Sequence, residues 1–331
     1  MSAQASPARK RSINPDQLGI WFLPVIIVAI IALMAVVEPR FFSRLNIFNI
    51  LRNFTVTGLL TLAQGLVMIV GGFDLSIGAI MAAGSVVAAL SMLAVTDPFY
   101  GSPMLIIAIG FAAALFVGCA LGAINGLLAA RLKASPFIIT LGTMTVISGL
   151  TYWHTKGAPI YGMPDELVSG IGRGQWMGVP VIFWFGLVVI ALLWLLASKA
   201  RFGRHMYAVG SNPAAARESG INPTRILVLV YGIAGMLAAA AGLILTARLG
   251  SGQSGIGGDA AIQSIAAAVI GGVSLRGGVG SIPRIAMAAL FLALMSNALN
   301  LAQIDSKFQT LVLGVFLIVF VAIERKFDRN V

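Results

Sequence analysis

Charged side chains are scarce in this sequence. Asp, Glu, Lys and Arg make up 10% of the 331 residues, whereas apolar residues make up 59%, and the mean hydropathy is +0.96. Soluble globular domains carry about 25% charged residues. The composition therefore argues against an ordinary soluble domain and predicts an all-α polytopic membrane protein.

Residue types that carry catalysis are also sparse. The two histidines, His154 and His205, lie at the ends of polar loops without metal-ligand spacing, and Cys119 has no intrachain partner for a disulfide. The sequence contains no Gly-Lys pair, hence no phosphate-binding loop, and no Gly-x-Ser-x-Gly elbow. We therefore predict a chain that is not an enzyme and holds no metal or cofactor. The eleven acidic residues form no proton relay, which disfavours ion-coupled transport.

Ten apolar segments are long enough, or nearly long enough, to cross a bilayer as helices of about 20 residues. They lie at 18–37, 54–70, 76–96, 104–130, 137–152, 181–198, 226–247, 260–272, 285–301 and 308–323. The eighth is short and flanked by glycine, so we expect a half-helix or a re-entrant segment and a total of eight to ten crossings. This predicts a transmembrane domain over 18–323 between cytoplasmic tails at 1–17 and 324–331.

The distribution of cations predicts the orientation. With the N-terminus and C-terminus inside, 15 of the 22 Lys and Arg residues fall on the cytoplasmic side and 7 outside. The polar connection 199–225 is then cytoplasmic and the connection 153–180 external. Three cations at 40–52 contradict the bias, so we expect that segment to form a helix lying in the membrane interface. Because the cations form no basic face, the net charge of +11 does not indicate nucleic-acid binding.

Asp74 is the only ionisable residue in the 44 positions between Arg52 and Asp97. It lies in Gly71-Gly72-Phe73-Asp74-Leu75-Ser76-Ile77-Gly78, where two apolar segments join. An aspartate inside a membrane usually faces a cavity, a partner or water. We predict a hinge in or beside a translocation pathway, formed by residues Gly71, Gly72, Asp74, Ser76 and Gly78. Capping of the following helix by Asp74 is the plainer interpretation, and the two are compatible.

A similar stretch recurs 200 residues later, as Gly271-Gly272-Val273-Ser274-Leu275-Arg276-Gly277-Gly278. Both copies read GG-x-x-L-x-x-G. A parallel internal repeat would place a second broken helix, with Gly271, Gly272 and Ser274, near a shared site. Glycine-rich membrane sequences also produce such matches by chance.

The cytoplasmic connection contains a short helix with clear boundaries. Asn212 is a good N-cap, Pro213 suits the first helical position and Gly220 ends the helix. Such a helix could be a solvated loop helix, or it could lie in a groove of a partner protein, with Ala214, Ala215 and Ala216 seated deeply. The residues that we expect to couple to a partner are Asn212, Pro213, Ala215, Ala216, Arg217, Glu218 and Gly220.

Over residues 45–325 the sequence resembles the permease subunits of bacterial ABC importers for simple sugars of the ribose, xylose, arabinose and galactose class. Four ordered motifs carry the resemblance: GGFDLSIG at 71–78, TLGTM at 140–144 with Gly149-Leu150, GRHMYAVGSNPAAARESGI at 203–221, and Asp259 with IAA through GGVSLRGGVGS at 265–281. Importer coupling loops often begin with Glu-Ala-Ala, whereas this sequence has Ala214, which puts an acidic contact to the ATPase in doubt.

The resemblance implies an inner-membrane permease that is surrounded by membrane lipid and works with three protein partners. They are an ATP-binding cassette subunit that carries ATP and Mg²⁺, a periplasmic sugar-binding protein, and a second permease as homodimer or heterodimer. We expect the binding protein to dock on the external connection through Lys156, Tyr161, Asp165 and Glu166. Open alternatives are a permease for a nucleoside, an autoinducer-type sugar or a branched-chain amino acid, and an ion-coupled secondary transporter.

Overall fold

The computed structural model describes residues 15–132, 134–305, 308, 311–312 and 314–315. These residues are mostly helical, with a single two-stranded hairpin, as the composition predicts. In chain order the elements are α1 (Pro15–Val37), η1 (Pro39–Phe42), α2 (Arg44–Ile69), α3 (Ile77–Thr96), α4 (Pro103–Arg131), α5 (Pro136–Thr155), η2 (Glu166–Gly172), β1 (Gln175–Trp176), β2 (Val179–Pro180), α6 (Val181–Ser198), α7 (Arg201–Ser211), α8 (Pro213–Glu218), α9 (Pro223–Leu249), α10 (Ala260–Ile270) and α11 (Ile282–Leu301).

Seven of the described helices are long and apolar enough to cross a membrane, namely α2, α3, α4, α5, α6, α9 and α11. Helix α1 has 23 residues, and its described apolar part is Leu23–Val37. The tenth expected segment, 308–323, lies mostly outside the described residues. An all-α polytopic fold is therefore confirmed, and the exact number of crossings stays a prediction.

Helix starts in this chain follow a simple rule. Five helices begin with proline directly after a Ser or Asn in the sequence, at Pro15, Pro103, Pro136, Pro213 and Pro223. Proline suits the first helical position because the N–H that it lacks would have no partner inside the helix. The apolar run that follows then sets the length of each membrane-crossing helix.

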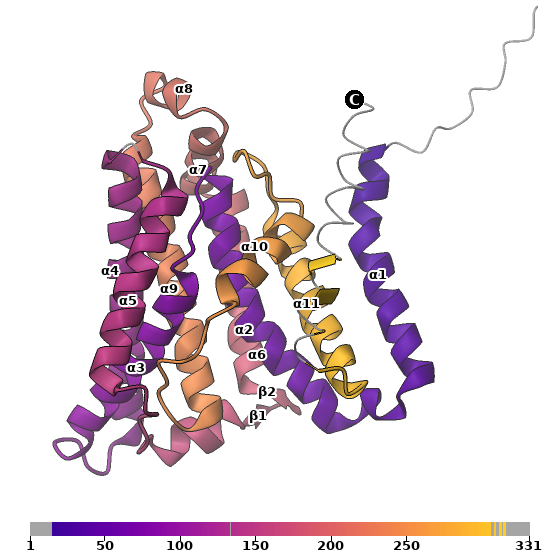
Figure 1. The fold of residues 1–331 in the computed structure, drawn as a ribbon, viewed down its shortest axis with the longest axis vertical. Coiled ribbons are helices and arrows are strands. Elements are labelled where there is room, and N and C mark those ends of the chain that lie inside the picture. The colour runs from indigo at the N-terminus through magenta and orange to yellow at the C-terminus, as the bar shows by residue number, and fades with distance from the viewer. Residues whose placement is uncertain (1–14, 133, 306–307, 309–310, 313, 316–331) are drawn as a thin grey trace, which may run out of the picture.

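The two ends of the bundle differ in what they carry (Figure 1). Helix α8 lies at one end, and the small antiparallel hairpin of β1 and β2, which pairs Gln175 with Pro180, lies at the other. We call these the α8 end and the hairpin end. Helix α1 starts at the α8 end and α2 starts at the hairpin end. The start of α1 and the connection 199–225 thus share one end, as the cation count requires.

Helix α9 packs between α3 and α4 through glycines. A Cβ atom on Gly126 of α4 would lie 2.8 Å from the Leu227 carbonyl oxygen of α9, and one on Gly84 of α3 would lie 2.6 Å from the Ala239 Cα. A Cβ atom on Gly122 would collide with the Tyr231 carbonyl. Small residues let membrane helices approach backbone to backbone, where van der Waals contact holds them together. These three helices form the centre of the bundle.

The expectation of an interfacial helix at 40–52 is wrong. Residues 44–52 are the first turns of the continuous helix α2, because no proline or glycine interrupts the chain between Arg44 and Asn53. Asn46 and Asn297 of α11 exchange two hydrogen bonds of 3.0 and 2.7 Å. The Arg44 guanidinium donates to the Gln175 side chain at 2.8 Å. Both contacts fix the start of α2 against the bundle.

Helix α10 is the half-helix that the short eighth segment predicts. Its eleven residues span about 16 Å, roughly half of a bilayer core. The chain before it, at 250–259, is not helical and runs along α3, where the Gln253 N–H donates to the Ser85 hydroxyl at 3.0 Å. Further along, Gly257 lies against the backbone of Gly78. A non-helical stretch of turns and bends along α3 therefore leads into the short helix of the eighth segment.

Reporter fusions test the predicted orientation. A reporter fused after Pro103 or after Gly170 is expected to read external, because both positions lie at the hairpin end. One fused after Asn212 is expected to read cytoplasmic, because α8 shares its end with the start of α1. A periplasmic-active alkaline phosphatase and a cytoplasm-active reporter at the same positions serve as mutual controls. An external signal at Asn212 would overturn the orientation.

Candidate functional site

Helix α2 ends in a left-handed glycine followed by a side-chain cap. Gly71 has φ +80° and donates its N–H to the Met68 carbonyl, while Gly72 donates to Val67, both at 2.9 Å. These bonds satisfy the free carbonyls of the last helical turn. Asp74 Oδ1 then accepts the Ser76 N–H at 2.8 Å and the Ser76 hydroxyl at 2.6 Å. Asp74 therefore supports the first turn of α3, as the capping interpretation predicts.

Three further helices converge on this loop. The Asn125 amide of α4 donates to the Ser76 hydroxyl at 2.7 Å. Thr140 of α5 accepts the Leu75 N–H at 3.1 Å, and the Tyr231 hydroxyl of α9 donates to the Phe73 carbonyl at 3.3 Å. The loop thus joins α2, α3, α4, α5 and α9 through polar contacts, so that a change in its conformation would be felt by all five helices.

Asp74 is fully buried, and no cation pairs with it among the residues that the structure describes. Its Oδ2 atom and the Oδ1 atom of Asn125 are both buried acceptors without a donor in that part of the chain. Burying a polar atom without a hydrogen bond costs free energy. Capping uses only one of the two Asp74 oxygens, so the cap alone does not account for an aspartate here. In this structure Asp74, Ser76 and Gly78 lie inside the packed bundle.

The second glycine stretch repeats this local geometry. At the end of α10, Gly272 has φ +76° and donates to the Val269 carbonyl at 2.8 Å, and Val273 donates to Ala268 at 3.1 Å. Ser274 Oγ accepts the Arg276 N–H at 3.1 Å, the same two-residue turn that Asp74 makes with Ser76. This recurrence favours a repeat over chance similarity. The left-handed glycine is the first of the pair at 71–72 and the second, after Gly271, at 271–272.

Helix α8 has the predicted caps. Asn212 Oδ1 accepts the N–H groups of Ala214 and Ala215, each at 3.0 Å, and Gly220 has φ +80°. The expectation that Ala214, Ala215 and Ala216 all seat in a partner needs correction. Ala216 is buried in the core of its own chain, whereas Ala214 and Ala215 are exposed. The outward surface consists of Pro213, Ala214, Ala215, Arg217 and Glu218.

Helix α7, which leads into α8, was not expected from the sequence. Its polar composition is typical of a loop, yet Gly203, Met206, Val209 and Gly210 are all buried. Their spacing of three, three and one is the pattern of a helix with one apolar face. That spacing is the signal that could have identified α7.

The residues predicted to meet a binding protein lie at the hairpin end. Lys156, Tyr161, Asp165 and Glu166 are all exposed, on the segment between α5 and η2 or at its edge. Their contact with another protein stays a prediction. Exposure is what such contact requires.

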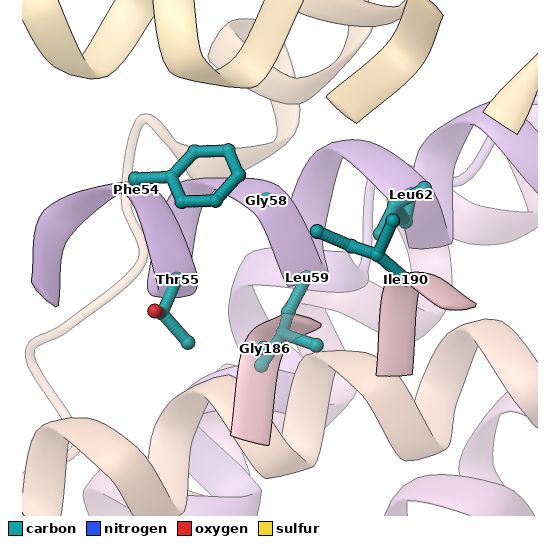
Figure 2. A pocket seen from close by; sticks show the side chains of 7 residues that line it. All are labelled: Phe54, Thr55, Gly58, Leu59, Leu62, Gly186 and Ile190. Atoms are coloured by element: carbon teal, nitrogen blue, oxygen red, sulfur yellow. The ribbon is translucent and has the colours of Figure 1, made fainter. Parts of the chain in front are cut away.

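A small hollow lies between α2 and α6 (Figure 2). Its interatomic space, open solvent included, is about 160 Å³ and leaves no room for a water molecule. It is lined by Phe54, Thr55, Gly58, Leu59, Leu62, Gly186 and Ile190. The single hydroxyl, on Thr55, already bonds to the Leu51 and Ile182 carbonyls at 3.0 and 3.4 Å. Sites for polar ligands need several free polar groups. This hollow therefore does not suit a sugar.

The outward faces of α5 and α6 differ in chemistry. Helix α6 exposes Leu187, Val188, Leu192 and Leu195, as a helix facing lipid tails does. Helix α5 exposes Gly142, Thr145, Ser148 and Gly149 along its middle, interleaved with the exposed apolar side chains of Leu141, Val146 and Leu150. The Thr145 hydroxyl donates to the Leu141 carbonyl of its own helix at 3.0 Å, as Ser and Thr in helices commonly do. The two glycines leave open space beside them.

Sequence reasoning did not identify Asn125 or Tyr231 as neighbours of Asp74. Asn125 is the only amide side chain in the apolar segment 104–130, and Tyr231 is the only tyrosine in the segment 226–247. A lone polar group in a membrane helix needs a buried partner, which is the signal that points to such residues. It does not say which partner.

Comparison with the sequences of known proteins identifies the family of this chain. Residues 46–321 match the profile of a family described as branched-chain amino acid transport system / permease component. The chain is 40% identical to a ribose import permease of Bacillus subtilis over 310 residues, which cover 93% of this chain and 91% of the relative.

Two other relatives match over similar lengths. A ribose import permease of Haemophilus influenzae is 37% identical over 300 residues, 90% of each chain. A D-allose transport system permease of Escherichia coli is 37% identical over 311 residues, 94% of this chain and 92% of the relative. No solved structure matches the chain. This chain therefore belongs to the family of transport-system permease components, as a multi-pass protein of the inner membrane.

Proposed function

We propose that this chain is the membrane permease of an ATP-driven importer and forms the translocation pathway for a monosaccharide. The observation that carries the proposal is the match to ribose and D-allose permeases over at least 90% of the chain. The family description mentions branched-chain amino acids, but these relatives, which align along nearly the whole chain, are named for sugars. ATP and Mg²⁺ would bind to a separate ATP-binding subunit.

Helix α8 is the surface offered to that subunit. A helix of six residues has no stability of its own in water, so its caps and the buried Ala216 hold it in place before a partner arrives. Its outward surface carries the small side chains of Ala214 and Ala215 and the charged side chains of Arg217 and Glu218. Such a surface suits a groove that has charges at its rim.

The pathway would run along the outward face of α5, where glycines and hydroxyl residues alternate with apolar side chains. The hydroxyl groups of a monosaccharide would donate to Thr145, whose own hydrogen already bonds to the Leu141 carbonyl at 3.0 Å, and would exchange hydrogen bonds with Ser148. Gly142 and Gly149 leave room beside them. A second permease would cover this face and close the pathway from lipid. The exposed Asp259 and Gln263, at the start of α10, are further polar groups outside the packed core. The two glycine loops would supply the bending between outward-open and inward-open states.

Reconstitution tests the proposed function. Vesicles that contain this chain, the ATP-binding subunit and a sugar-binding protein are expected to take up labelled ribose or allose only with ATP. Ionophores that collapse ion gradients should not change this uptake.

Charge reversal by Asp165→Lys with Glu166→Lys should weaken the stimulation of ATP hydrolysis by the binding protein, because it removes the acidic groups predicted to dock it. Uptake by this chain alone under an ion gradient would contradict the proposal, and an unchanged stimulation curve would remove the docking residues.

Substitutions in α8 test its docking role. Ala215→Glu places a charge and extra bulk on the outward surface and is expected to abolish retention of the ATP-binding subunit at normal membrane abundance, whereas Ala215→Ser should retain it. Gly220→Val should also impair coupling, because a residue with a Cβ at positive φ costs roughly 1–2 kcal/mol. Gly220→Asn is the control, since Asn tolerates that conformation. Normal capture of the subunit by both Ala215→Glu and Gly220→Val would leave α8 as a solvated helix.

Asp74→Asn separates capping from a role in transport. Asparagine keeps an oxygen for the Ser76 N–H but removes the charge, so the protein should insert normally. Uptake is expected to fall about tenfold, within the range of roughly 5- to 150-fold typical of coupled equilibria. Asp97→Asn, at the other end of α3, is the matched control. Normal uptake by Asp74→Asn would reduce Asp74 to a cap.

A further inference from the structure

Three chain segments meet at the end of α7 largely through their backbones. They are the end of α2 at 69–71, the end of α7 at 210–211 and the loop at 277–278 that precedes α11 (Figure 1). The Gly278 N–H donates to the Ile69 carbonyl at 2.8 Å. We call this contact the glycine junction.

Glycine is required at the centre of the glycine junction. A Cβ atom on Gly210 would collide with the Ile69 carbonyl oxygen and would lie 2.7 Å from the Gly278 nitrogen. One on Gly277 would lie 2.7 Å from the Gly210 carbonyl oxygen and 2.9 Å from the Gly71 Cα. Side chains could absorb a displacement by changing rotamer, but backbone in direct contact cannot. The three segments must therefore move together or separate.

Helix α7 connects the glycine junction to α8. The Asn212 N–H donates to the Ala208 carbonyl at 3.1 Å, so that the last turn of α7 leads directly into the cap of α8. The Tyr207 hydroxyl donates to the Gly280 carbonyl at 2.9 Å. Burial raises the pKa of this hydroxyl above its ordinary value, so it stays protonated and keeps donating. Helix α7 is thus attached to the loop before α11 at two points.

The glycine junction also touches both glycine stretches. Residues 69–71 immediately precede the loop that holds Asp74, and Gly277 and Gly278 immediately follow the turn made by Ser274. A single displacement at Gly210 would therefore reach the end of α2 and the start of α11. Both helices pack against the half-helix α10.

We propose that the glycine junction transmits movement of α8 to both glycine stretches at once, and that Gly210 is its central positioning residue. The inference rests on the proposed function, because it takes α8 as the docking surface for the ATP-binding subunit. It adds a route through which docking and ATP hydrolysis reach the membrane helices. It also gives α7 a function, which the docking role of α8 alone does not explain.

Gly210→Ala tests the inference in the full complex. The added methyl group must separate α7 from Ile69 and Gly278 while the outward surface of α8 stays unchanged. Retention of the ATP-binding subunit and its ATP hydrolysis are expected to stay normal, and sugar uptake per ATP hydrolysed should fall about tenfold, within the range of coupling between sites. Gly58→Ala, also a buried glycine, is the matched control, because its Cβ would meet only Phe54 at 3.9 Å.

A milder variant keeps the inference testable if Gly210→Ala fails to fold. Tyr207→Phe removes only the bond to the Gly280 carbonyl and should lower the same ratio in part, at normal abundance. If both variants kept the unmodified ratio, the glycine junction would not transmit the movement. If either lost the ATP-binding subunit, the substitution would act through docking, which would also overturn the inference. Failure of the unmodified complex to require ATP would instead defeat the proposed function.

Discussion

Close backbone approach at glycine is the constraint on which this structure depends. Helices in lipid gain little from hydrophobic burial against one another, so they are held by van der Waals contact and hydrogen bonds. Gly84, Gly122 and Gly126 bring α3 and α4 into direct contact with the backbone of α9. Larger residues at these positions would push the helices apart and remove the contacts that replace hydrophobic burial. The same constraint acts at Gly210, where it joins α7 to two other segments.

Polar groups inside the bundle form a second layer of organisation. Asn46 and Asn297 satisfy one another, and Ser85 bonds to Thr246 at 2.7 Å, so these pairs fix neighbouring helices without leaving an unpaired group between them. The cluster around Asp74 differs, because two of its acceptor oxygens lack donors among the described residues. A fully satisfied pair favours one arrangement. A partly satisfied cluster is held less firmly, as a site that changes conformation needs to be.

The sequence predicts the helices and the caps of α8 well, because apolar length and the residues Asn212, Pro213 and Gly220 act locally. It predicts the half-length of α10 for the same reason. It fails where long-range packing decides. The first turns of α2 looked interfacial because their cations are visible in the sequence, whereas the pairing of Asn46 with Asn297, 251 residues away, is not. Helix α7 was missed because its short apolar stripe lies in a polar segment, and the sequence does not show the core against which that stripe packs.

The arrangement of rigid and bendable parts suggests how one chain can hold two states. Helices α3, α4 and α9 are joined backbone to backbone and should move as one body. Helix α11 instead follows a half-helix and a loop with left-handed glycines at Gly272, Gly277 and Gly278. Glycine tolerates changes of backbone conformation that other residues resist. Bending therefore costs the least free energy at the two glycine stretches. Because both touch the end of α7, the parts most able to move are also those nearest to α8.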